Sequence, residues 1–232
     1  MQGPNKNDYD VLTFDCYGTL IDWGQGINDY LIPTFLAHDA HVIGSWVLGY
    51  FSEMEPQAQA QGGSYREVLA DVVKRFGSRL GFNPTDEQSQ GFAESIGAWP
   101  PFDDTIDALK RLSESFDLAI VSNVDSDLFD ATNKTLEVTF KHIVTAGDVG
   151  AFKPDPRMFD AAREAIGADA RILHVAQSLY HDVAPANAKG IDTVWINRSG
   201  STSGAARAAE AEPKWTYGDL ATFTDSILAT GT

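Results

Sequence analysis

The sequence contains a single cysteine, Cys16, and lacks any long run of apolar residues. One cysteine cannot form a disulfide within the chain, which suits a reducing compartment. No apolar run approaches the roughly 18 residues needed to span a bilayer, and residues 1–10 lack the basic start and apolar stretch of a signal peptide. We therefore expect a cytoplasmic protein with no membrane partner.

Positive charge is also scarce. The chain has 17 lysines and arginines but 33 aspartates and glutamates, so its net charge is −16 at pH 7. A chain this acidic repels phosphate backbones, and we expect no nucleic-acid partner. The same charge repels a carboxylate substrate unless the binding pocket is locally positive. With 232 residues, 43% of them hydrophobic, the chain can form one large domain or a core with a smaller insert.

Short apolar segments recur along the chain, and each is ended by polar or glycine residues. Segments of this length and composition predict buried β-strands. Between these segments, apolar residues recur at the intervals of a helix, as Ile106, Leu109 and Leu112 do. Strands that alternate with helices predict an α/β fold with a doubly wound parallel sheet, covered by helices on both faces. The predicted strands are 11–14, 118–121, 143–146, 172–176 and 193–196.

Residues 23–99 interrupt this alternation because they contain no segment typical of a buried strand. They carry three helical stripes of apolar side chains instead, and the clearest of these is ended by Gly81. We predict a helical cap domain at 23–99, inserted after the first strand, and a Rossmann-like core domain of 1–22 and 100–232. The segment 199–211, rich in Gly, Ser and Ala, predicts a surface loop.

Polar residues follow the predicted strands at the sheet edge where open parallel sheets bind ligands. Asp15, directly after the first strand, is a carboxylate able to act as a covalent nucleophile. Lys153 supplies positive charge to a crowded anionic site and lowers the pKa of Asp15. Cys16 is interpreted as a small buried hydrophobe. The candidate site residues are Asp15, Tyr17, Thr19, Ser122, Asn123, Lys153, Gln177, His181 and Asp182.

Residues 14–22, Phe-Asp-Cys-Tyr-Gly-Thr-Leu-Ile-Asp, resemble the first motif of the haloacid dehalogenase superfamily. Segments 122–123 and 153–155, and the segment that ends at Asp182, are similar to its later motifs and follow in the same order. The resemblance covers the whole chain, including a helical cap after the first motif. It implies that Asp15 forms a covalent intermediate, with Lys153 and Asp182 as the other catalytic residues.

One chemical point divides this superfamily. Its phosphatases carry a second aspartate two residues after the nucleophile and bind Mg²⁺ with a late acidic residue, but here these positions hold Tyr17 and Gln177. Mg²⁺ prefers charged oxygen ligands. The Asp-Cys-Tyr-Gly-Thr segment resembles instead the 2-haloacid dehalogenases, which use no metal or other cofactor. The resemblance implies that Asp15 displaces halide from a small carboxylate substrate, that water hydrolyses the ester, and that the protein is a homodimer.

The chain departs from the dehalogenase pattern in its cap. The dehalogenases carry an arginine there that grips halide or substrate, whereas here Val47 takes its place and Arg66 is the candidate replacement. Phe159 stands where they have a tyrosine. Three alternatives stay open: opening of small diacid epoxides by Asp15 with His181 as base, Mg²⁺-dependent phosphate hydrolysis, and a non-catalytic relative that binds a small acid or a partner. The predicted substrate-binding residues are Tyr17, Thr19, Ser122, Asn123, Gln177 and His181.

Overall fold

The computed structural model describes residues 3–198 and 211–229, so most of the loop predicted at 199–211 lies outside the described residues. The described chain contains a six-stranded parallel sheet with the order β3-β2-β1-β4-β5-β6. The first five strands confirm the five predicted segments to within one residue at each end. The strands are β1 (Val11–Phe14), β2 (Asp117–Ser122), β3 (His142–Thr145), β4 (Ile172–Ala176), β5 (Asp192–Ile196) and β6 (Trp215–Tyr217).

Strand β1 lies in the middle of the sheet, and all its residues are buried. It pairs in parallel with β2 on one side and with β4 on the other. The strand order therefore runs one way from β1 through β2 and β3 and the other way through β4, β5 and β6. Such a switch point, at the carboxyl ends of the strands, is where open α/β sheets bind their ligands.

The sequence did not predict β6. This strand has three residues, none of them buried, and it pairs with β5 at the edge of the sheet. A segment this short cannot display the alternation of apolar and polar residues that identifies a half-buried strand. Its pairing partner, rather than its own pattern, defines it as a strand.

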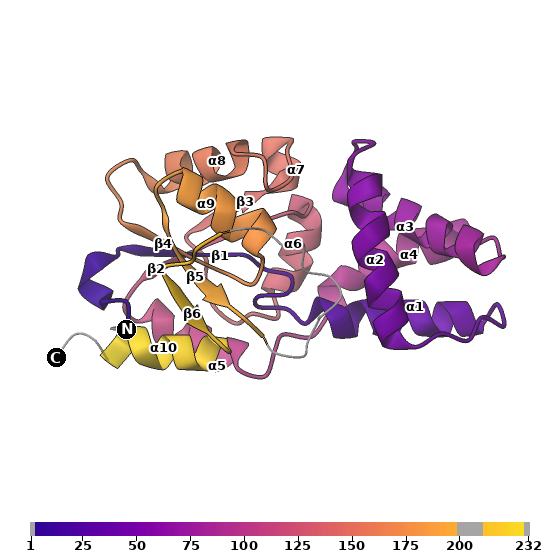
Figure 1. Ribbon diagram of the computed structural model, residues 1–232, viewed down its shortest axis with the longest axis horizontal. Coiled ribbons are helices and arrows are strands. Elements are labelled where there is room, and N and C mark those ends of the chain that lie inside the picture. The colour runs from indigo at the N-terminus through magenta and orange to yellow at the C-terminus, as the bar shows by residue number, and fades with distance from the viewer. Residues whose placement is uncertain (1–2, 199–210, 230–232) are drawn as a thin grey trace.

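Helices cover both faces of the sheet (Figure 1), which confirms the doubly wound α/β prediction. Helices α5 (Thr105–Ser113) and α10 (Leu220–Ala229) lie on one face, and α8 (Arg157–Ile166) and α9 (Ala184–Ala188) lie on the other. Along β1, Val11 packs with residues of α8 and α9, whereas Leu12 and Phe14 join the core on the opposite face. The shorter helical segments are η1 (Lys6–Asp8), η2 (Ser95–Ala98), α6 (Ser126–Asn133), α7 (Ala146–Val149) and η3 (Leu179–Val183).

Four helices separate β1 from α5 and form a group beside the sheet (Figure 1). We call them the inserted helices. Three of them match the apolar stripes in the sequence. The fourth, α4, was not predicted, although Thr85 and Gln88 form a capping box at its start, which is a sequence signature of a helix N-terminus. The inserted helices are α1 (Trp23–Leu36), α2 (Gly44–Gln59), α3 (Tyr65–Leu80) and α4 (Asp86–Glu94).

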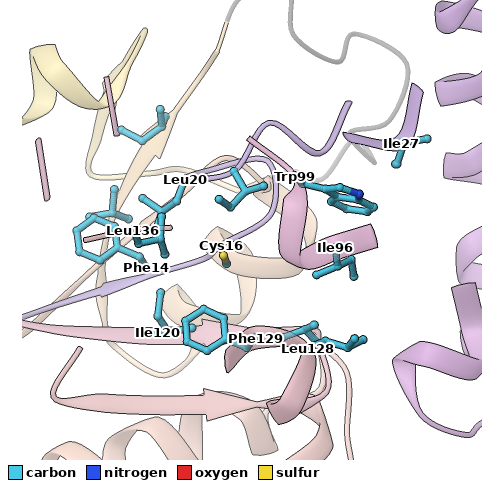
Figure 2. Close-up of a cluster of buried hydrophobic side chains, with 14 of the residues drawn as sticks. Phe14, Cys16, Leu20, Ile27, Ile96, Trp99, Ile120, Leu128, Phe129 and Leu136 are labelled. Atoms are coloured by element: carbon cyan, nitrogen blue, oxygen red, sulfur yellow. The ribbon is translucent and has the colours of Figure 1, made fainter. Parts of the chain in front are cut away.

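One continuous apolar core joins the sheet to the inserted helices. Cys16 is fully buried in it, among Phe14 and Ile120 of the sheet and Ile96 and Trp99 near the end of the insertion (Figure 2). This burial confirms the interpretation of Cys16 as a small hydrophobe. Among the described residues, no helix has the length and apolar character that crossing a membrane requires.

The packing of α1 against Trp99 predicts the effect of one added methyl group. A Cβ at Gly26 would overlap the Trp99 ring, which is buried and has little room to move. We expect Gly26→Ala to lower the free energy of unfolding by about 1–3 kcal/mol, the usual penalty of overpacking. Urea denaturation measures this change.

The matched control is Gly49→Ala in α2, because nothing lies within 4 Å of a Cβ at that position. Alanine favours a helix interior over glycine by roughly 0.5–1 kcal/mol, so this variant is expected to gain stability. Equal stabilities of the two variants would contradict the packing described for Gly26.

Candidate active site

Three neighbouring strands end at the same edge of the sheet, as predicted. Asp15 follows β1 directly, Ser122 is the last residue of β2, and Gln177 follows β4. The parallel pairing of β1 with β2 and β4 places these ends side by side. Lys153 joins them from the loop between α7 and α8. The sheet topology therefore assembles the site from segments that are far apart in the sequence.

A tight turn after β1 brings Thr19 against Asp15. Gly18 opens this turn with a φ of 96°, in the left-handed region that glycine adopts most easily. The Thr19 hydroxyl donates to Asp15 Oδ2 at 2.7 Å and accepts the Gln177 backbone N–H at 2.9 Å. Thr19 is fully buried and does not line the cavity described below. The structure therefore places its hydroxyl where it orients Asp15.

Lys153 bridges two buried carboxylates. Its ammonium donates to Asp15 Oδ1 at 2.8 Å, to Asp182 Oδ1 at 2.6 Å and to the Val121 carbonyl at 2.8 Å, which uses all three of its hydrogens. The Asn123 amide accepts the Lys153 backbone N–H at 2.6 Å and donates to its carbonyl at 3.1 Å. The side chains of Lys153 and Asp182 are each 1% exposed, so solvent screens this pair very little.

A buried histidine that the sequence reading did not single out supports Asp182. His174 Nε2 lies 3.1 Å from Asp182 Oδ1, and its Nδ1 lies 2.9 Å from the Thr13 hydroxyl. Because the Asp182 carboxylate only accepts hydrogen bonds, His174 Nε2 carries the hydrogen of this contact. The available signal was one histidine inside the apolar run of β4, where a buried polar group requires a partner.

One ammonium shared by two carboxylates sets their pKa values apart. Burial raises the pKa of Asp182, but the charge of Lys153 and the hydrogen bond from His174 outweigh it and lower the pKa to about 2. Burial also raises the pKa of Asp15, and Lys153 and Thr19 offset this only in part because the Asp182 charge adds to the rise. Burial lowers the pKa of Lys153, but both carboxylates reverse this and raise it. Lys153 is therefore an ammonium and Asp182 a carboxylate at neutral pH.

A cavity of about 120 Å³ lies between these strand ends and the inserted helices. It is smaller than the roughly 300–1,000 Å³ pockets that hold drug-sized ligands, so it suits a small molecule. Eight of the nine predicted site residues line it, Thr19 being the exception. The sequence did not predict which residues line its other side, because a helical stripe does not reveal which face turns towards the strand ends. These are Trp23, Ile27, Phe51, Ser52, Glu55, Pro56 and Tyr65, together with Trp99.

Ser122 and Tyr17 differ in what they offer to a ligand. The Ser122 hydroxyl is buried, belongs to a residue that lines the cavity, and makes no hydrogen bond to another described residue. An unsatisfied buried hydroxyl costs roughly 1–3 kcal/mol, so a polar ligand atom would stabilise it. The Tyr17 hydroxyl lies 2.9 Å from Thr132 Oγ1, and its ring packs edge-on against Trp99 at 5.9 Å. Tyr17 therefore presents its ring rather than a free hydroxyl.

Arg66 does not take the place of the arginine that the resemblance led us to expect. Its guanidinium pairs with acidic side chains at the surface, including Asp127 at 2.6 Å, and Arg66 does not line the cavity. Phe159 is also away from it, packed edge-on against His174 at 5.0 Å. Among the described residues that line the cavity, Lys153 is the single lysine or arginine.

The donor set at the strand ends does not fit a magnesium ion. Asp15 and Asp182 are already bridged by the Lys153 ammonium, and Tyr17 and Gln177 are neutral. Mg²⁺ prefers carboxylate oxygens and near-octahedral geometry. In the part of the chain that the structure describes, no three His, Cys, Asp or Glu side chains are grouped to hold a metal ion.

Comparisons with known proteins agree with this architecture. A model of the haloacid dehalogenase-like hydrolases matches residues 9–198. The chain is 26% identical over 168 residues to an (S)-2-haloacid dehalogenase of Pseudomonas putida, covering 71% of this chain and 73% of that protein. It is 33% identical over 141 residues to the (S)-2-haloacid dehalogenase of Pseudomonas sp. (strain YL), and this match covers 60% of this chain and 61% of that protein.

A solved structure supports the fold independently. The L-2-haloacid dehalogenase of Xanthobacter autotrophicus, with chloropropionic acid covalently bound, matches with a TM-score of 0.80 at 18% identity. The match covers 97% of this chain and 99% of that chain. At this identity the likeness establishes the shared fold alone.

Removing the bridging ammonium is predicted to destabilise the protein strongly. Lys153→Met leaves two buried carboxylates without their shared cation, and breaking a buried ion pair costs about 3–5 kcal/mol. The control is Lys141→Met, which removes an exposed pair with Asp117 at 2.6 Å and is expected to change stability by less than about 1 kcal/mol. Urea denaturation at neutral pH measures both, and similar losses for the two variants would count against the bridge.

Proposed function

We propose that this chain, which belongs to the haloacid dehalogenase-like hydrolase family, hydrolyses the carbon–halogen bond of short 2-haloalkanoic acids through an ester on Asp15. The observation that carries the proposal is the Asp15 carboxylate at the wall of a small cavity, held in place by Lys153 and Thr19. A fixed carboxylate of this kind can attack an sp³ carbon that bears a leaving group. The relatives named (S)-2-haloacid dehalogenases favour halide as that group.

The proposed reaction has two steps. In the first, an oxygen of Asp15 forms a bond to the halogen-bearing carbon, and halide leaves with the electron pair of the broken bond. In the second, water attacks the carbonyl carbon of the Asp15 ester, which releases a 2-hydroxy acid, restores the carboxylate and frees one proton. Asp182 is the group proposed to orient this water and accept its proton, since Lys153 and His174 fix the carboxylate beside Asp15.

The substrate carboxylate is proposed to bind at the core side of the cavity. Ser122 offers a buried hydroxyl without another partner among the described residues, and Asn123 and Gln177 line the cavity beside it. Thr19 acts on the substrate only through Asp15. Tyr17 and Gln177 are neutral residues at the two positions where the phosphatases of the superfamily carry acidic ones. This difference supports a reaction without metal.

The inserted helices are proposed to form the cap. They supply one side of the cavity that Asp15 faces, which supports the division into a cap of 23–99 and a core of 1–22 and 100–232. Closing such a cavity excludes water during the first step and strengthens the electrostatic interactions within it. The homodimer and the cytoplasmic location stay predictions.

Epoxide opening is the second candidate, and His181 favours it. His181 lines the cavity and is the neighbour of Asp182 in the chain. In that reaction Asp15 would attack a ring carbon of a small epoxide diacid, and His181 would activate the water that hydrolyses the ester. A panel of halide and epoxide substrates separates the two reactions.

The nucleophile is tested by isotope incorporation as well as by loss of activity. We expect the wild type to release halide from haloacetates or 2-chloropropionate with a chelator present, and Asp15→Asn to release none. The control Asp10→Asn removes an exposed carboxylate just before β1 and is expected to keep activity.

In a single turnover in ¹⁸O-water, mass spectrometry should find the label in Asp15, because water attacks the carbonyl carbon of the ester. Label found only in the product would contradict the ester.

The pH dependence is predicted from the pKa of Asp15. The ionised carboxylate is the attacking species, so protonation abolishes activity. Because burial raises the pKa of Asp15 above its usual 3.8, activity is lost above pH 3.8 as the solution is acidified. Asp182, with a pKa of about 2, remains ionised there. The pH profile of kcat/KM checks this, and an acid limb below pH 3.8 would show that another group controls the reaction.

A further inference from the structure

A carboxylate from the sheet side of the molecule caps one of the inserted helices. Asp125 lies in the loop after β2, whereas Tyr65 and Arg66 are the first two residues of α3. Asp125 Oδ1 accepts the Tyr65 backbone N–H at 2.9 Å, and Asp125 Oδ2 accepts the Arg66 backbone N–H at 2.9 Å. The first N–H groups of a helix have no acceptor within the helix. Asp125 therefore supplies acceptors that this end of α3 lacks.

Ser64 caps the next position of α3 from within the insertion. Its hydroxyl accepts the Glu67 backbone N–H at 3.2 Å, so Asp125 binds the two N–H groups that this local cap leaves over. A carboxylate at a helix N-terminus is favoured by the helix dipole, and hydrogen bonds to a charged acceptor are stronger than those between neutral groups. The two oxygens of Asp125 thus make a charge-assisted contact between the loop after β2 and the inserted helices.

The loop that carries Asp125 also belongs to the candidate active site. Ser122 and Asn123 line the cavity, and the Asn123 amide binds both backbone groups of Lys153. Val124, between Asn123 and Asp125, is fully buried. Because the loop is fixed in this way, its contact with α3 sets where the inserted helices lie relative to Lys153.

Tyr65 connects this contact to the cavity on the side of the inserted helices. Its backbone N–H binds Asp125, and the residue lines the cavity. Its ring centroid lies 6.2 Å from that of Phe152, the residue before Lys153. A shift of the α3 N-terminus away from Asp125 would therefore remove part of one side of the cavity.

A groove of about 860 Å³ lies beside the contact. Both Ser64 and Asp125 line this groove. Pro56, Lys153 and His181 line the groove and the cavity alike, so the two spaces are neighbours. Separation of α3 from Asp125 would widen the groove where it adjoins the cavity.

We propose that Asp125 is a positioning residue that holds the inserted helices closed over the cavity, and that the α3 N-terminus leaves it when substrate enters from the groove. The reaction that follows closure rests on the function proposed above, but the closing contact does not. Asp125 touches no substrate and acts through Tyr65 and the helix that begins there. The closed state is the one that binds substrate, because only then does the cavity have both of its sides.

Asp125→Asn keeps the size of the side chain but replaces one acceptor oxygen with an NH₂ group, which cannot accept a backbone N–H. A smaller closed fraction raises KM in proportion, whereas saturating substrate selects the closed state and leaves kcat unchanged. We expect KM for 2-chloropropanoate to rise about tenfold, as for the loss of one charge-assisted hydrogen bond. A lower kcat at unchanged KM, the result of having less folded protein, would overturn the proposal.

The matched control is Asp127→Asn, which makes the same change of charge two residues further along the chain. It removes an exposed partner of the Arg66 guanidinium at 2.6 Å and leaves the bond from the Arg66 backbone to Asp125 in place. Exposed ion pairs contribute little, so we expect KM to stay within about twofold of the wild-type value. Equal increases of KM in the two variants would overturn the role of Asp125, because they would show only the effect of charge.

The position of the inserted helices is measured without any reaction. Because Cys16 is fully buried, spin labels attach selectively to cysteines introduced at exposed positions, Lys74→Cys in α3 and Glu164→Cys in α8. Pulsed electron paramagnetic resonance then gives the distance between the two labels. We expect Asp125→Asn to shift this distance to longer values, since α3 moves away from the sheet, and Asp127→Asn to leave it unchanged.

The label distances separate this proposal from the function on which its kinetic test rests. The same distances in the wild type and in Asp125→Asn would overturn the closing contact and leave the dehalogenase function standing. Longer distances in Asp125→Asn, with no halide release from any haloacid by the wild type, would support the closing contact and remove the dehalogenase function.

Discussion

The Lys153 ammonium between the carboxylates of Asp15 and Asp182 is the interaction on which the rest of the site depends. Neither carboxylate could be buried at neutral pH without a cation, because desolvation of an unpaired charge costs several kcal/mol. One lysine serves two acids, so their pKa values move apart, with Asp182 below and Asp15 above the usual value. As a result, Asp182 stays ionised in the pH range where Asp15 titrates.

The sheet topology explains why these groups meet. Because β1 lies between β2 and β4, the segments after three strands share one edge, and each supplies a different element of the site. The segment after β1 supplies Asp15, and the turn at Gly18 returns Thr19 to its carboxylate. Strand β4 supplies His174 from within the sheet, so that Asp182 is held from the core as well as by Lys153.

The inserted helices form one side of the cavity. In so acidic a chain, a carboxylate substrate is expected to need a locally positive pocket. Glu55 lines the cavity on the side of the inserted helices, where the resemblance led us to expect an arginine. Arg66, the candidate replacement for that arginine, pairs with Asp127 at the surface instead.

The sequence by itself determined the family and five strands, along with eight of the residues around the cavity, because these depend on local signals: short apolar runs, a turn glycine and polar residues at strand ends. Only the tertiary structure decided that Thr19 supports Asp15, that His174 contacts Asp182, and that Glu55 rather than Arg66 faces the cavity. These contacts join residues across the fold. They depend on which helix face turns inward, and helical periodicity defines an apolar face without defining what it meets.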